Sequence, residues 1–94
     1  MSARDGPHTV TEAVRLLKGL LEPEELAALQ SLAEDRLLDE HFGIAVFIRQ
    51  AFSLWRGNET LLAATGQHHP DDAAMVILTA LWRDLQADGR TRLH

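Results

Sequence analysis

Residues 66–73, GQHHPDDA, place two histidines directly before two aspartates, which are side chains that could form a metal site or an acid–base pair. A similar order, a proline followed by two acids and an apolar residue, occurs in EPEEL at 22–26, where no histidine is present. The pattern is typical of a helix start, because proline suits the first helical position and first-turn carboxylates stabilise the exposed N–H groups by about 0.3–1 kcal/mol. We therefore interpret Asp71 and Asp72 as first-turn residues of a helix.

A metal site in this segment would need three or four ligands that converge at roughly 2.0–2.2 Å. The adjacent His68 and His69 do not readily aim at one ion, and the chain has no cysteine and no two histidines spaced four apart. A cluster of His41, one of these histidines and Asp72 could be assembled only by folding. We expect no metal site and no cofactor, with His69 preceding the helix and His68 facing solvent.

Two polar residues, His41 and Arg49, fall on the apolar surface of a helix predicted over about 35–56. We expect His41 to be a partly buried, hydrogen-bonded residue, with a titrating or ligand-contacting group as the alternative. A buried guanidinium needs an acidic partner or several carbonyl acceptors. The sequence therefore predicts that Arg49 pairs with Asp71 or Asp72 and ties this helix to the next long one, with a surface arginine as the alternative.

The remaining candidate residues are Trp55, Asn58 and Trp82. The tryptophans are predicted to lie in the core or at its rim, whereas an exposed pair would indicate a protein-binding patch. Asn58 follows Gly57 and is predicted to cap the next helix. The candidate structural or binding cluster consists of His41, Arg49, Trp55, Asn58, His69, Asp71, Asp72 and Trp82.

Catalytic motifs are missing from the sequence. It contains no glycine-rich phosphate loop, no nucleophile elbow and no Cys–His set, and its three serines lie in no recognisable setting. We therefore predict no catalytic residues and a protein that is not an enzyme.

The composition favours an all-α fold. Leucine and alanine dominate, tyrosine is absent, and valine and isoleucine are few. We predict a compact single-domain bundle of about five helices, with a flexible lead-in at 1–8, a helical domain at 9–88 and a tail at 89–94. The central helix contains Gly43, and Gly89 is predicted to end the last helix. The helices are expected at about 10–20, from 22 to near 31–34 (short), 35–56 (central), 59–65 (short) and 70–87.

Negative charge is concentrated in the first part of the chain. The formal net charge is −5, and residues 1–40 hold nine acids and four bases. Without a basic patch, nucleic-acid binding is not expected. Acids that could face a protein partner, or simply form a solvated helix face, are Glu24, Glu25, Glu34 and Asp35.

The longest apolar stretch of the last helix does not reach the length of a membrane span. Residues 73–82 give ten uncharged residues, about half of what a bilayer requires, and the N-terminus lacks the apolar run of a signal peptide. We expect no membrane association and a cytoplasmic location.

Three segments together resemble a known family. They are H-F-G-x4-I-R beginning at His41, L-W-x-G-N beginning at residue 54, and P-D-D-A-x2-I-x3-L-W beginning at residue 70. In this order they resemble a family of short bacterial proteins that is a domain of unknown function. The resemblance implies bacterial origin and a small helical domain, but no activity. Gln50 departs from the asparagine expected after the arginine, which weakens any role for an amide there.

These observations favour a non-catalytic helical protein-interaction module of the immunity-protein, antitoxin or adaptor type, with an unidentified protein partner. The main alternative is a small-molecule or metal-binding protein that uses the His41, Arg49, His69, Asp71 and Asp72 cluster. DNA binding through the helix junction LWRGNETLL is a weaker hypothesis, and it requires that Arg56, Arg83, Arg90 and Arg92 cluster on one surface. Self-association into a homo-oligomer is also open.

Overall fold

The longest helix, α5 (Pro70–Arg92), is the element against which most of the other helices pack. The computed structural model describes residues 7–40, 43–52 and 58–92. All regular structure in these ranges is helical, which confirms the predicted all-α fold. The other elements are α1 (Val10–Leu20), α2 (Pro23–Gln30), a 3-10 helix η2 (Glu34–Glu40), α3 (Ile44–Ala51) and α4 (Glu59–Ala64).

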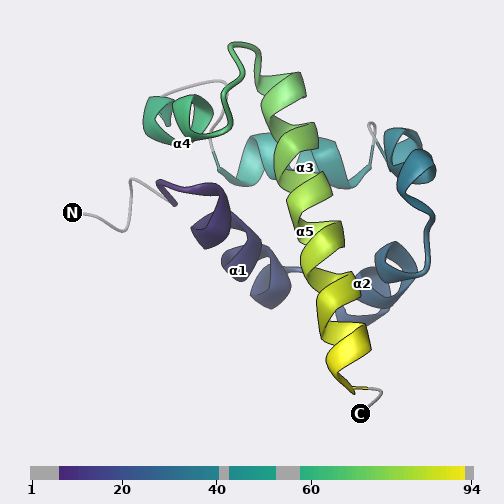
Figure 1. Cartoon of the computed structure of the whole chain (residues 1–94). Coiled ribbons are helices and arrows are strands. Elements are labelled where there is room, and N and C mark those ends of the chain that lie inside the picture. Colours follow the sequence, from purple (N-terminus) through teal and green to yellow (C-terminus); the bar gives the residue numbers. More distant parts are fainter. Residues whose placement is uncertain (1–6, 41–42, 53–57, 93–94) are drawn as a thin grey trace.

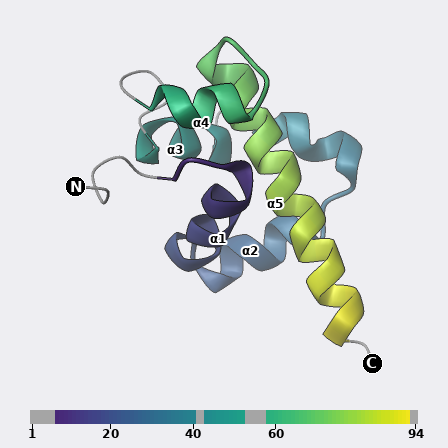
Figure 2. The same cartoon turned by 60° about the vertical axis from the view of Figure 1, so that its left-hand side comes forward.

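The core is built along one side of α5. Figure 1 shows this helix running lengthwise through the molecule, with α3 crossing behind it and α1 alongside. Figure 2, turned by 60°, shows α3 and α4 near the N-terminal end of α5, and α1 and α2 farther along its length. The core residues that α5 contributes recur at helical spacing and are Ala73, Ala74, Ile77, Leu78, Leu81 and Leu85.

The elements that face α5 bury matching apolar residues. From α1 these are Ala13, Val14 and Leu17, and from α3 they are Ala45 and Ile48. The alanines allow the helix backbones to approach closely. Although α5 is long, no helix in the described part of the chain has both the length and the apolar character needed to cross a membrane.

The predicted continuous helix over 35–56 is wrong. In its place the chain forms η2, leaves helical geometry at Gly43 (φ −114°, ψ −99°) and begins α3 at Ile44. Glycine is a poor helix former, so the chain departs from the helix at this residue at little cost. The consequence is that α5, rather than the 35–56 segment, is the central element.

The glycines at two predicted helix ends behave differently. Gly66, directly after the helix expected at 59–65, has a positive φ of 77° and follows Thr65, the C-cap residue of α4. Gly89 does not end α5, which continues to Arg92, so residues 89–92 of the predicted tail are helical. Glycine ends a helix by adopting the left-handed conformation, and among the described glycines only Gly66 does so.

Hydrogen bonds join the end of α2 to α5. The Gln30 side chain donates to the carbonyl of Leu85 (2.6 Å), and the Gln86 side chain donates to the carbonyl of Gln30 (2.6 Å). The indole N–H of Trp82 donates to the carbonyl of Leu32 (2.9 Å), just beyond α2. Trp82 is partly buried against the core, which confirms its predicted position at the core rim.

One lysine joins α1 to the C-terminal half of α5. The Lys18 ammonium lies 2.5 Å from a carboxylate oxygen of Asp84 and 2.6 Å from one of Asp88. The hydrogen bonds to Asp84 and then to Asp88 raise the pKa of Lys18 above its ordinary value of 10.5. The single cation also separates two carboxylates that lie four residues apart on one helix.

Leu81→Ala is expected to lower the free energy of unfolding by about 2–5 kcal/mol, because it leaves a cavity in the fully buried contact surface of α5. Val76→Ala, on the half-exposed side of the same helix, should cost less than about 1 kcal/mol. Urea unfolding of both variants measures the difference, and equal losses would show that α5 has no preferred buried side.

Lys18→Met is expected to lower the free energy of unfolding by about 1 kcal/mol at neutral pH, because the three groups are partly exposed. The folded pKa of Lys18 lies above the unfolded value of 10.5, so this stabilisation is complete below pH 10.5 and is lost as the pH rises through the folded pKa. Urea unfolding below and above pH 10.5 should show that the difference in free energy of unfolding between wild type and Lys18→Met becomes smaller at the higher pH. Lys18→Arg, which stays charged, should keep its stability there, and a difference independent of pH would contradict the account.

Candidate interaction groove

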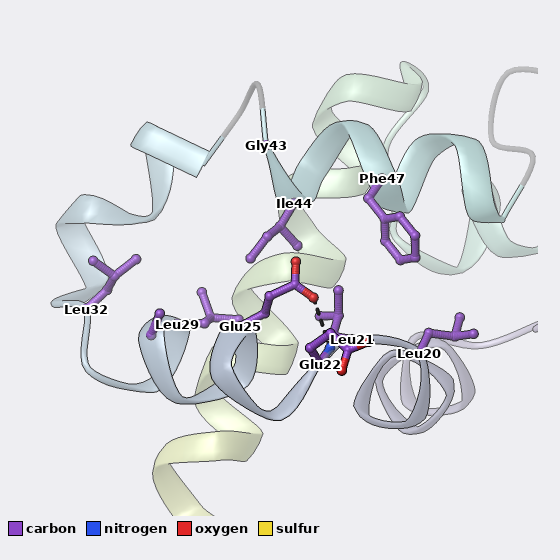
Figure 3. A pocket seen from close by; sticks show the side chains of 10 residues that line it. Leu20, Leu21, Glu22, Glu25, Leu29, Leu32, Gly43, Ile44 and Phe47 are labelled. Carbon is purple, nitrogen blue, oxygen red and sulfur yellow. Dashed lines mark hydrogen bonds between the residues drawn. The ribbon is translucent and has the colours of Figure 1, made fainter.

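An apolar groove opens between the α1–α2 junction and the start of α3. Its volume is about 480 Å³. Figure 3 shows Ile44 and Phe47 projecting from α3 towards Leu20 and Leu21 at the end of α1, with Leu29 of α2 on the other side. The volume lies within the range of about 300–1,000 Å³ that is usual for ligand-binding clefts.

The local sequence explains how α1 and α2 form one wall of the groove. Helix α1 ends when Leu21 turns to extended geometry while its N–H still donates to the carbonyl of Leu17 (2.9 Å). Pro23 then begins α2 at the first helical position. Only Leu21 and Glu22 separate the two helices, so the buried Leu21 faces the core while its neighbour Leu20 remains on the outside.

The large apolar side chains that remain exposed all lie at or beside this groove. Among the described residues they are Leu16, Leu20 and Phe47, with 46%, 55% and 38% of their surface exposed. Leu16 and Leu20 are four residues apart, so they lie on the same face of α1. Leu20 and Phe47 line the groove itself. Together, the three side chains extend the apolar surface beyond the cavity.

Two carboxylates line the groove, and one of them is held in place. The backbone N–H of Glu22 donates to Oε1 of Glu25 (2.9 Å), which satisfies a free donor at the start of α2. Figure 3 shows the Glu25 side chain reaching from α2 into the space below Ile44. The groove therefore combines an apolar lining with a fixed negative charge.

Sequence reasoning missed this groove. Leu20 continues the helical spacing of the buried residues Ala13 and Leu17, but 55% of its surface is exposed, because the face of α1 that contacts α5 is narrower. Phe47 lies directly before the buried Ile48, away from the buried side of α3. The sequence did hold one indication of an exposed apolar surface. Leu16 and Phe47 are large apolar residues at helix positions that the core does not use.

The predicted ion pair of Arg49 is confirmed. Nη1 of Arg49 lies 2.8 Å from Oδ1 of Asp71, with 12% and 35% of the two side chains exposed. The contact lacks the alignment of a hydrogen bond, so it is an electrostatic contact at short range. It ties α3 to the first turn of α5, as the sequence predicted.

The histidine–aspartate segment begins α5. Nδ1 of His69 accepts a hydrogen bond from the backbone N–H of Asp71 (3.1 Å), and the His69 carbonyl accepts one from Ala73 (3.0 Å). His69 therefore occupies the capping position before Pro70. His68 and Asp72 are exposed. Within the described ranges, no three His, Asp or Glu side chains are grouped so that they could hold a metal ion.

Asn58 caps α4, as predicted, and also connects distant segments. Its Oδ1 accepts from the backbone N–H of Leu61 (3.2 Å), while Nδ2 donates to the carbonyls of Pro7 (3.2 Å) and Phe52 (3.1 Å). With 6% of its surface exposed, Asn58 is a buried structural residue. The predicted cluster members His41 and Trp55 lie outside the described residues. Of the described members, Arg49, Asn58, His69 and Asp71 make structural contacts near helix ends, Trp82 packs against the core, and Asp72 is exposed. None of them lines the groove.

The four acids predicted to face a partner are all exposed: Glu24, Glu25, Glu34 and Asp35. Two of them also have roles within the fold. Glu25 accepts the Glu22 N–H, and the Glu34 carboxylate lies 2.9 Å from the Arg83 guanidinium of α5. Only Glu25 of the four lines the groove.

A family model described as a domain of unknown function, DUF6794, matches residues 6–85. The matched range includes both walls of the groove, the Arg49–Asp71 ion pair and Asn58. Comparison with curated proteins and with solved structures gave no match.

Asp71→Asn is expected to lower the free energy of unfolding by about 2 kcal/mol, because it leaves the mostly buried Arg49 guanidinium without its carboxylate. Asp72→Asn removes a charge from the same helical turn at an exposed position and should cost less than about 1 kcal/mol. Thermal and urea unfolding of the two variants distinguish the contribution of the ion pair to stability from that of the charge at the helix N-terminus. Equal losses would mean that Arg49 contributes nothing through Asp71.

Proposed function

The chain belongs to the DUF6794 family, a domain of unknown function, and we propose that it is a non-catalytic protein-interaction module that binds a protein partner in the groove between the α1–α2 junction and α3. The proposal includes a bacterial cytoplasmic setting and a role of the immunity-protein, antitoxin or adaptor type. Each of these functions requires a small, stable domain with one surface reserved for a partner.

The observation that carries the proposal is the position of the exposed apolar side chains. The exposed large apolar side chains lie at or next to one cavity: they are Leu16, Leu20 and Phe47. By contrast, the apolar residues between α1 and α5 are buried in the core. Apolar surface that stays exposed in a contiguous patch is typical of a binding site, because covering it provides free energy for association. Aromatic side chains such as Phe47 are common anchors at the centre of protein interfaces.

The contacts of the polar cluster support a non-catalytic role. Arg49 and Asp71 form an ion pair, His69 caps α5, and Asn58 caps α4. Each of these side chains has a structural contact that accounts for its position. The alternative function, small-molecule or metal binding by the His41, Arg49, His69, Asp71 and Asp72 cluster, draws less support, because the groove lies at other residues.

Site-specific photocrosslinking tests the proposal. A photoreactive phenylalanine analogue at Leu20, in protein expressed in its native host, is expected to crosslink to a partner of defined mass. Phe47→Asp should abolish that crosslink and weaken binding of the purified partner by more than about tenfold, because it places a charge in the apolar lining.

The control introduces the same charge at an exposed residue outside the groove lining. Thr11→Asp lies in the exposed first turn of α1, away from the groove, and should leave the crosslink and the affinity unchanged. Circular dichroism checks that both variants fold. A partner that crosslinks equally to the Phe47→Asp variant, or the absence of any crosslink from Leu20, would overturn the proposed docking site.

A further inference from the structure

From the charges at the groove, and resting on the function proposed above, we infer that its occupant is an amphipathic helix of a partner protein that sets a lysine or arginine against Glu25 beside its apolar anchors. The charged side chains that line the cavity are Glu22 and Glu25, and both are acidic. Neither forms an ion pair with another described residue, whereas Lys18, Arg36, Arg49 and Arg83 all have carboxylate partners. The negative charge at the groove is therefore available to a partner.

Glu25 is preorganised to receive a cation. Because Oε1 already accepts the Glu22 N–H at 2.9 Å, the side chain is held in one orientation before a partner binds. Its second oxygen remains near the apolar lining, and Figure 3 shows the carboxylate directed towards Ile44. Glu25 therefore loses little additional side-chain entropy when a cation binds here, and the attraction between cation and carboxylate strengthens as the apolar partner excludes water.

The shape of the apolar surface favours a helix over a small ligand. The surface continues from the cavity along α1 through Leu20 to Leu16, one helical turn away. A small molecule would fill the cavity and leave this extension uncovered. An amphipathic helix would place anchors at the spacing of one or two turns over both parts, which is a common mode of helix recognition in an apolar groove.

A second copy of the chain fits this surface less well. In a twofold dimer the same groove would face itself and bring Glu22 and Glu25 close to their own copies. The net charge of −5, with nine acids against four bases in residues 1–40, adds to that repulsion. An anionic lipid surface would be repelled for the same reason.

A displayed library of random helical peptides, selected on the purified full chain, provides the probe. The enriched sequences are expected to combine apolar residues at helical spacing with a nearby lysine or arginine. Synthetic peptides from the selection should bind wild type with an affinity that falls as salt is added, because the ion pair is screened.

Three variants separate the charge from the groove. Glu25→Gln keeps an oxygen that accepts the Glu22 N–H but removes the charge, and should weaken peptide binding by about tenfold and reduce its salt dependence. Glu24→Gln removes a charge one residue away, outside the groove lining, and should change the affinity by less than about twofold. Phe47→Asp should weaken it by more than about tenfold.

The outcomes distinguish this inference from the proposed function. Selected peptides without basic residues, or equal binding by wild type and Glu25→Gln, would overturn the inferred partner charge while the groove remains the docking site. Failure to enrich any peptide that depends on Phe47 would overturn both. Concentration-dependent dimerisation in analytical ultracentrifugation, abolished by Phe47→Asp, would identify a second copy as the occupant and also overturn the inference.

Discussion

The packing of one side of α5 is the constraint on which the rest of the structure depends. All pairs of described elements with extensive backbone contact include α5, whose partners are α1, α2, α3 and η2. Its buried residues Ile77, Leu78 and Leu81 have no exposed surface. The polar contacts follow the same plan, since Arg49 holds α3 to the first turn of α5 and Lys18 holds α1 to its C-terminal half. The ion pairs therefore join α5 to the same two helices, α1 and α3, that pack their apolar residues against it.

This arrangement also explains why a groove exists. Helices α1, α2 and α3 each pack against α5, but α3 makes no comparably extensive contact with α1 or α2 in the described part of the chain. The space between them is left open, and the outer side chains Leu20 and Phe47 line it. The break at Gly43 sets where α3 begins and therefore where Ile44 and Phe47 stand. The proposed binding surface therefore exists because α1, α2 and α3 pack mainly against α5 rather than against one another.

The parts of the structure that sequence predicted well depend on local chemistry. The Pro-acid-acid pattern marks the start of α2 and α5, Asn58 caps α4, and a guanidinium on an apolar face required a carboxylate partner, which is Asp71. The break of the 35–56 segment was not predictable from periodicity, because its apolar spacing is compatible with one long helix. The groove depends on the relative placement of three helices, which no local pattern encodes. Of the candidate residues, sequence therefore identified those at helix ends and the acid Glu25, and it missed the apolar residues on the open surface.

Residue-resolved amide hydrogen exchange tests the central role of α5 most directly. If α5 is the common support, its amides at residues 77–85 exchange only through global unfolding and are the slowest in the protein. The amides of α2, which buries only Leu29, should exchange faster through local opening. Exchange of residues 77–85 at the rate of α2, with slower exchange elsewhere, would show that another element holds the fold together and would contradict the account.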